Sequence, residues 1–108
     1  MNLYVYSRYG METQRLCSVL DKHLSSRQYL VAETYTIADM IIYPWINHLF
    51  NGYVHASGVG AKDVLSMEQY VHVAQWADRV RSREAVQRGM TVCTKGAGKP
   101  WIELEEGK

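Results

Sequence analysis

The sequence predicts an all-α protein, a helical bundle of about four helices. Its 108 residues are 47% hydrophobic and 21% charged with only two prolines, which is typical of a globular, mostly helical chain. Apolar residues recur at helical spacing in successive segments. Thr36 stands three positions before Asp39, directly ahead of an apolar run, and this is the sequence form of a reciprocal helix cap. A chain of this length has room for one domain.

The segment that follows the cap, residues 37–50, is predicted to be the central helix. Its residues are apolar on nearly every side, which favours a position in the middle of a bundle. Thr36 can accept a hydrogen bond from the backbone near Asp39, and the carboxylate can reach back to the Thr36 N–H at the positive end of the helix dipole. Pro44 predicts a bend in this helix, and Asn51-Gly52-Tyr53 predicts its end.

The first predicted helix covers residues 2 to about 24, with Leu16, Leu20 and Leu24 on one stripe. Gly10 is its weak point, because glycine costs about 1 kcal/mol relative to alanine inside a helix. The tyrosines at positions 4, 6 and 9 favour either contact with another surface or packing under a loop. Residues 25–28 break the helix, and residues 29–31 are a short extended segment.

Residues 51–66 are predicted to form a loop, with one helical turn near residues 62–65. Ser66 is the expected cap of a helix over residues 67–80, and a last short helix is expected from Ser82 to about Gly89. We place the boundary of the helical domain at residue 95. Residues 96–108 then form an extended C-terminal tail.

Charge and cysteine content restrict the class of protein. A net charge of +1 gives no general attraction for nucleic acid, and the arginines and lysines late in the chain are best explained as a solvated face. No apolar run reaches the roughly 18–20 residues of a membrane span. Two distant cysteines without a C-x-x-C motif favour reduced thiols and a cytoplasmic location. The four histidines lack metal-ligand spacing, so no metal is expected.

Three motifs agree in order with one known family: Tyr29-Leu30-Val31-Ala32-Glu33-Thr34-Tyr35-Thr36-Ile37-Ala38-Asp39, then Tyr43-Pro44-Trp45, then Trp76 followed by Arg83-Glu84-Ala85-Val86 and Gly89. They resemble the C-terminal helical domain of cytosolic glutathione transferases, and within these the nu class with disulfide reductase activity. The family usually has glycine in place of Ala32 and proline in place of Glu84. The first one or two helices of that domain have no counterpart, so the predicted bundle is incomplete.

The resemblance implies a function that depends on more than this chain. In the family, glutathione is the co-substrate and is held by a thioredoxin-like domain that precedes the helices. This sequence has no βαβ pattern that would correspond to such a domain. The chain then resembles the C-terminal part of such an enzyme or a truncated homologue, with no catalytic residue of its own. We expect a homodimer, or association with the missing N-terminal thioredoxin-like domain, because absent helices would leave apolar surface uncovered.

The resemblance also suggests individual site residues. Arg8 matches an arginine that contacts glutathione across the dimer, and the alternative is a solvated arginine on a helix face. Tyr43 and Trp45 are similar to aromatics that line or back the second-substrate pocket, with core packing preferred for Trp45. Tyr4 is a weaker candidate for that pocket. Cys17 and Cys93 are interpreted as thiols without catalytic function.

Two hypotheses from different classes follow. The chain is either the helical part of a nu-class-like glutathione transferase, or a transferase-like interaction module that kept the helical core and lost the chemistry. Retention on immobilised glutathione and reduction of a mixed disulfide would separate them.

Overall fold

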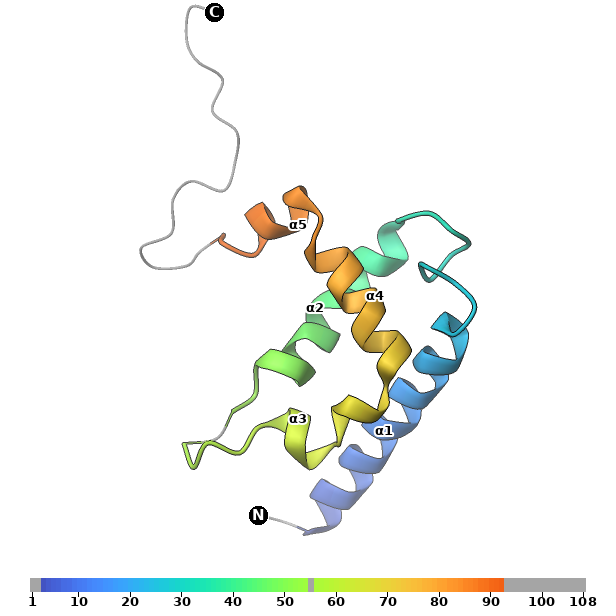
Figure 1. Ribbon diagram of the computed structural model, residues 1–108. Coiled ribbons are helices and arrows are strands. Elements are labelled where there is room, and N and C mark those ends of the chain that lie inside the picture. The colour runs from blue at the N-terminus through green and yellow to red at the C-terminus, as the bar shows by residue number, and fades with distance from the viewer. Residues whose placement is uncertain (1–2, 55, 93–108) are drawn as a thin grey trace, which may run out of the picture. The chain divides into compact units, whose positions relative to one another are not determined.

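The computed structural model describes residues 3–54 and 56–92, and all its regular elements are helices (Figure 1). They are α1 (Leu3–Leu24), α2 (Ile37–Asn51), α3 (Ala61–Val64), the 3₁₀ helix η1 (Met67–Gln69), α4 (Val71–Arg81) and α5 (Glu84–Gly89). In these residues, β-type pairing is limited to two isolated bridges, Val31 with Thr34 and Val54 with Gly60. The all-α prediction is therefore confirmed.

The predicted helix positions agree with the structure for most of the chain. α1 continues through Gly10, α2 ends at Asn51 with Gly52 as its C-cap, and α5 ends at Gly89. The predicted turn near residues 62–65 is α3. The expected tail and the boundary at residue 95 lie outside the described residues, as do Cys93, Lys95, Lys99, Trp101 and His55.

The chain divides into two compact units, residues 1–77 and 78–108. The first unit has a core of fully buried side chains that includes Met67, Val73 and Trp76, together with Cys17 and Tyr43 at 3% exposure. In the described part of the second unit, Arg81 forms an ion pair with Asp78, and Arg88 forms one with Glu84.

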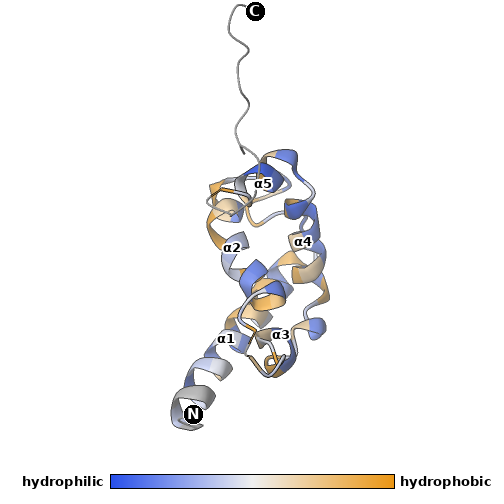
Figure 2. Cartoon of the chain, turned by 90° about the vertical axis from the view of Figure 1, so that its left-hand side faces the viewer, coloured by the Kyte–Doolittle hydropathy of each residue, from blue (hydrophilic) through white to orange (hydrophobic). Residues whose placement is uncertain are grey.

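α2 is not enclosed on all sides as the sequence predicts. Its buried residues, Asp39, Tyr43 and Ile46, are spaced i, i+4 and i+7, so they form one face. Ile37, Ile41 and Trp45 are 70%, 60% and 64% exposed. Figure 2 shows hydrophobic residues along α2 in orange. The prediction of a fully surrounded helix is wrong here, because the described residues cover only one face of it.

The start of α4 also differs from the prediction. Ser66 has φ 51° and precedes η1 without a side-chain cap, while α4 begins at Val71. The acceptor for the first turn of α4 comes from α1. Oδ1 of Asp21 accepts hydrogen bonds from the backbone N–H groups of His72 at 2.9 Å and Val73 at 3.1 Å. Asp21 thus satisfies two N-terminal donors of α4 from a distant part of the chain.

We expect Asp21→Ala to lower the free energy of unfolding by about 1–2 kcal/mol, because it removes the cap and a negative charge at a helix N-terminus. Urea denaturation followed by circular dichroism measures this change. Asp78→Ala is the matched control, since that carboxylate is exposed and forms an i,i+3 ion pair with Arg81, and its removal should change stability by less than about 0.5 kcal/mol. Equal effects of the two substitutions would contradict the capping role.

The turn before α2 contains a strained alanine. Val31 and Thr34 form an antiparallel bridge, and Ala32 between them has φ 56°. An L-residue with a side chain is disfavoured by roughly 1–2 kcal/mol in this left-handed region, whereas glycine is not. Ala32 stands where the family that this sequence resembles usually has glycine.

We expect Ala32→Gly to stabilise the chain by about 0.5–1 kcal/mol, because relief of the strain exceeds the entropy that glycine adds to the unfolded state. Thermal denaturation should show a rise in Tm. Ala74→Gly, inside α4, is the matched control and should lower Tm, since glycine costs about 1 kcal/mol within a helix. A fall in Tm for both variants would be inconsistent with strain at Ala32.

Candidate functional site

Asp39 is the one buried charged residue among the described residues of the first unit, with 0% exposure. Its Oδ1 accepts hydrogen bonds from the Leu30 N–H at 3.1 Å and from Nε1–H of Trp76 at 2.8 Å. Its Oδ2 accepts one from the Thr36 N–H at 2.9 Å, and the Thr36 hydroxyl donates to the same oxygen at 3.4 Å. One carboxylate therefore joins the segment before α2, the first turn of α2, and α4.

Thr36 and Asp39 form the capping box at the start of α2. The Asp39 N–H also donates to the Thr36 carbonyl oxygen at 3.1 Å. Within residues 3–54 and 56–92, every buried side-chain nitrogen or oxygen has a hydrogen-bond partner. Both oxygens of Asp39 therefore accept hydrogen bonds that hold the helices together. The Thr36–Asp39 pair has a structural role, and neither carboxylate oxygen is directed at a substrate.

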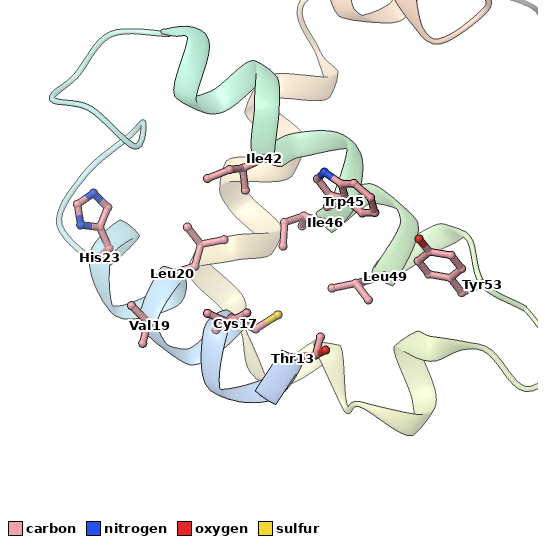
Figure 3. A pocket seen from close by; sticks show the side chains of 11 residues that line it. Thr13, Cys17, Val19, Leu20, His23, Ile42, Trp45, Ile46, Leu49 and Tyr53 are labelled. Atoms are coloured by element: carbon pink, nitrogen blue, oxygen red, sulfur yellow. The ribbon is translucent and has the colours of Figure 1, made fainter. Parts of the chain in front are cut away.

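A groove of about 670 Å³ lies between α1 and α2 (Figure 3). Side chains of the two helices face each other across it, and Tyr53 lies beyond the end of α2. The size is within the range of ligand-binding pockets. Its lining contains no aspartate, glutamate, lysine or arginine and consists of Thr13, Leu16, Cys17, Val19, Leu20, His23, Ile42, Trp45, Ile46, Leu49 and Tyr53.

Several polar groups of this groove are already bonded within the chain. The Thr13 hydroxyl donates to the Tyr9 carbonyl oxygen at 2.8 Å. Nε2 of His23 lies 2.7 Å from the Leu30 carbonyl oxygen, and Nη1 of Arg27 lies 3.1 Å from the same ring nitrogen. Burial raises the pKa of the Cys17 thiol, which lowers the thiolate fraction at neutral pH. The groove is therefore an apolar surface without an activated nucleophile.

The two aromatic residues predicted for the second-substrate pocket occupy different environments. Tyr43 is 3% exposed and makes an edge-to-face contact with Trp76, with ring centroids 6.2 Å apart. Trp45 is 64% exposed and lines the groove, so the preference for core packing of Trp45 is wrong. Tyr43 shares the face of Asp39 four residues earlier, whereas Trp45 is turned about 200° from Tyr43 around the helix.

Arg8 and Tyr4 are both exposed on α1. Glu12, one turn after Arg8, has a lowered pKa, because Arg15 donates hydrogen bonds to it and the charges of Arg15 and Arg8 add to the effect. Neither Arg8 nor Tyr4 lines the groove, and Tyr43 does not line it either. None of the three predicted site residues therefore lines this groove.

Other predicted features can be compared within the described residues. No cluster of three or more histidine, cysteine, aspartate or glutamate side chains is positioned to hold a metal ion in that part of the chain. None of its helices is both long and apolar enough to cross a lipid bilayer. Tyr9 is 66% exposed, as Tyr4 is at 73%.

Comparison with known proteins identifies the family. A family profile described as "Glutathione S-transferase, C-terminal domain" matches residues 10–84. Disulfide-bond oxidoreductase YghU of Escherichia coli (strain K12) is 40% identical over 89 residues, which cover 82% of this chain and 30% of that protein. Disulfide-bond oxidoreductase YfcG of the same organism is 33% identical over 87 residues, covering 81% and 35%. An uncharacterized GST-like protein of Streptococcus mutans is 35% identical over 89 residues, covering 82% and 33%. No solved structure matches the chain.

The chain is a helical domain in which α2 begins at a Thr36–Asp39 cap with a buried carboxylate, and it matches this profile over most of its length. The chain belongs to the glutathione S-transferase family as a C-terminal domain of the nu-like type. The resemblance seen in the motifs is confirmed. The chain spans about a third of the length of the curated relatives it matches.

Proposed function

We propose that the chain is the C-terminal helical part of a nu-class-like glutathione transferase that reduces disulfides, with residues 1–95 as the helical domain and 96–108 as a tail. The observation that carries the proposal is the 40% identity to a disulfide-bond oxidoreductase across 82% of the chain. In this proposal glutathione is the co-substrate, and the thioredoxin-like domain of the longer protein holds it. The helical part supplies pocket walls and dimer contacts and has no turnover alone.

Arg8 is proposed to contact a glutathione carboxylate across the dimer. Its exposed position on α1 supports this role, since a guanidinium on a helix surface can reach a partner subunit. A guanidinium can donate two parallel hydrogen bonds to one carboxylate. Tyr4 is proposed to line the second-substrate pocket. Tyr43 is proposed to back that pocket from the core, because it is held against Trp76.

The proposed partner is a second copy of the longer protein, and the proposed location is the cytoplasm. Exposed apolar side chains on α1 and α2 support an association that covers them; those of Met11, Val19, Ile37 and Ile41 are all more than half exposed. A monomeric protein rarely exposes contiguous apolar patches beyond a few hundred Å².

The test is disulfide reduction with glutathione and a glutathione mixed disulfide as substrates. The chain alone should show no turnover, and a fusion in which this chain replaces the segment of YghU that it matches should show it. Turnover by residues 1–108 alone would refute the proposed division of roles. A folded fusion that binds immobilised glutathione but never reduces the disulfide would favour the alternative, a non-catalytic interaction module.

In that fusion, we expect Arg8→Ala to raise the KM for glutathione about tenfold or more with a small change in kcat, because a charge-assisted bond to a carboxylate contributes about 1.5–3 kcal/mol. Arg8→Lys should recover only part of the loss, since an ammonium group lacks the planar fork. Arg15→Ala, on the same helix and paired with Glu12, is the matched control and should leave KM unchanged. A KM for Arg8→Ala equal to that of the control would remove Arg8 from the site.

A further inference from the structure

A second hollow, of about 480 Å³, lies at the C-terminal end of α1, and we refer to it as the basic hollow. Its lining consists of Val19, Lys22, His23, Ser26 and Arg27, all of them exposed, and it includes no acidic residue. The chain as a whole has a net charge of +1, so this concentration of basic side chains is a local feature. The lining differs in this respect from that of the apolar groove, which contains no lysine or arginine.

The guanidinium of Arg27 is held against the imidazole ring of His23. Its Nη1 lies 3.3 Å from Nδ1 and 3.1 Å from Nε2 of that ring. The hydrogen-bonding directions of the two ring nitrogens diverge, so Nη1 is well aligned with at most one of them. A guanidinium carries five N–H donors in a fixed fork. The contact with His23 therefore positions Arg27 and leaves most of its donors for an acceptor outside the chain.

The positive charge of the basic hollow is not compensated by a nearby acid. In the part of the chain that the structure describes, neither Lys22 nor Arg27 lies within ion-pair distance of a carboxylate. Asp21 is the acidic residue next to Lys22 in the sequence, and its Oδ1 accepts the hydrogen bonds from the first turn of α4. Fixed positive charges without a counter-charge favour an anion from solution.

The helix dipole explains only part of this cluster. Lys22 and His23 lie in the last turn of α1, where basic side chains complement the negative end of the dipole. Arg27 lies beyond the end of the helix and contacts His23. The carbonyl oxygens of Lys22 and Leu24 already accept hydrogen bonds from the backbone N–H groups of Ser25 and Arg27. Capping of α1 therefore does not account for the Arg27 side chain.

We propose that the basic hollow binds the phosphate group of a small phosphorylated organic molecule. The Arg27 fork donates two parallel hydrogen bonds to phosphate oxygens, and the Lys22 ammonium and the Ser26 hydroxyl are donors in the same lining. A phosphate monoester carries close to two negative charges at neutral pH, which match the charges of Lys22 and Arg27. The volume leaves room for an organic group, for which Val19 is an apolar contact.

The basic hollow is separate from the proposed glutathione contact. Arg8 lies fourteen residues before Lys22 on the same helix, a distance of about 21 Å at the α-helical rise per residue. The inference goes beyond the proposed function and does not depend on it, because glutathione takes no part in the assays below.

The experiment titrates ¹⁵N-labelled residues 1–108 with phenyl phosphate at constant pH and ionic strength and follows the amide resonances by NMR. We expect saturable shifts of the amides of residues 19–27 with a Kd in the millimolar range. Inorganic phosphate should bind more weakly because it lacks the contact with Val19, and benzenesulfonate should bind more weakly because it carries one negative charge. Absence of saturation for phenyl phosphate, or equal binding of benzenesulfonate, would overturn the proposal.

Substitutions locate the site. Lys22→Gln and Arg27→Gln should each weaken phenyl phosphate binding about threefold or more, as expected for exposed ion pairs. Lys62→Gln is the matched control, because Lys62 is exposed on α3 and does not line the hollow. Circular dichroism checks that each variant keeps its helix content. A loss of affinity in the Lys62→Gln variant equal to that of Lys22→Gln would indicate diffuse attraction and overturn the proposal.

Two further outcomes would assign the basic side chains to another role. If inorganic phosphate binds as tightly as phenyl phosphate, the hollow selects the free ion, and the proposal of an organic phosphate is overturned. If Lys22→Gln and Arg27→Gln lower Tm but leave the Kd unchanged, the two side chains stabilise the end of α1 and do not bind phosphate. Lys22→Gln gives the clearer test of the two, since the Arg27 side chain also contacts His23.

Discussion

Asp39→Ala is expected to lower the free energy of unfolding by about 3–5 kcal/mol. Three N–H groups, those of Leu30, Thr36 and Trp76, lose their acceptor at once. The substitution puts no acceptor in their place, and the surrounding residues admit little water because Asp39 is 0% exposed. Domains of this size are stable by about 5–15 kcal/mol. The loss therefore removes a large share of the stability, and at the lower end of that range it leaves a large unfolded fraction.

Urea denaturation and amide hydrogen exchange measure this effect. Exchange at the N–H of Leu30 and Thr36 should accelerate most, because those groups lose a direct partner. Asp78→Ala is the control for removal of an aspartate from an exposed helix surface, and it should change stability by less than about 0.5 kcal/mol. If Asp39→Ala behaves like Asp78→Ala, the carboxylate does not hold the first unit together.

Trp76→Phe is expected to lower the free energy of unfolding by about 2–3 kcal/mol. Phenylalanine keeps a ring against Tyr43 but lacks the Nε1–H that donates to Asp39 Oδ1 at 2.8 Å. It is also smaller, and it leaves space in a core position that is 0% exposed. Part of the cost is thus a lost hydrogen bond and part is a cavity.

Trp45→Phe separates these effects from the general cost of replacing a tryptophan. Trp45 is 64% exposed, so its replacement should change stability by less than about 0.5 kcal/mol. Thermal unfolding of the single variants Asp39→Ala and Trp76→Phe and of the double variant Asp39→Ala/Trp76→Phe gives the coupling free energy between the buried carboxylate and the indole. We expect the double variant to be more stable than the sum of the single losses predicts, by about 1–2 kcal/mol. Strict additivity would show that the 2.8 Å contact contributes nothing.

The local sequence predicted a helix start or end wherever the residues that form it are neighbours in the sequence. The Thr36–Asp39 cap and the end of α2 at Gly52 depend on residues within a few positions of each other, and both were predicted. The start of α4 was not, because Asp21 lies about fifty positions before the N–H groups that it caps. An aspartate in the middle of a helical pattern carries no local signal of such a distant contact.

The candidate site was less predictable than the helices. Helical periodicity shows which residues share a face, but it does not show which face is covered. Tyr43 and Trp45 are two positions apart in an almost wholly apolar segment, and only the packing of α4 through Trp76 decides that Tyr43 is the buried one. The groove and its charge-free lining involve two helices distant in sequence, so no single motif could reveal it.

By itself, then, the sequence determined the helical class, the family and the cap at Asp39, because each is encoded in neighbouring residues with a fixed spacing. The tertiary structure alone decided that this carboxylate also receives the indole of Trp76 and the Leu30 amide, that Asp21 caps α4, and that α1 and α2 border an uncovered apolar groove. The physical reason is that hydrogen bonds and burial between distant segments depend on how helices pack, which local spacing does not specify.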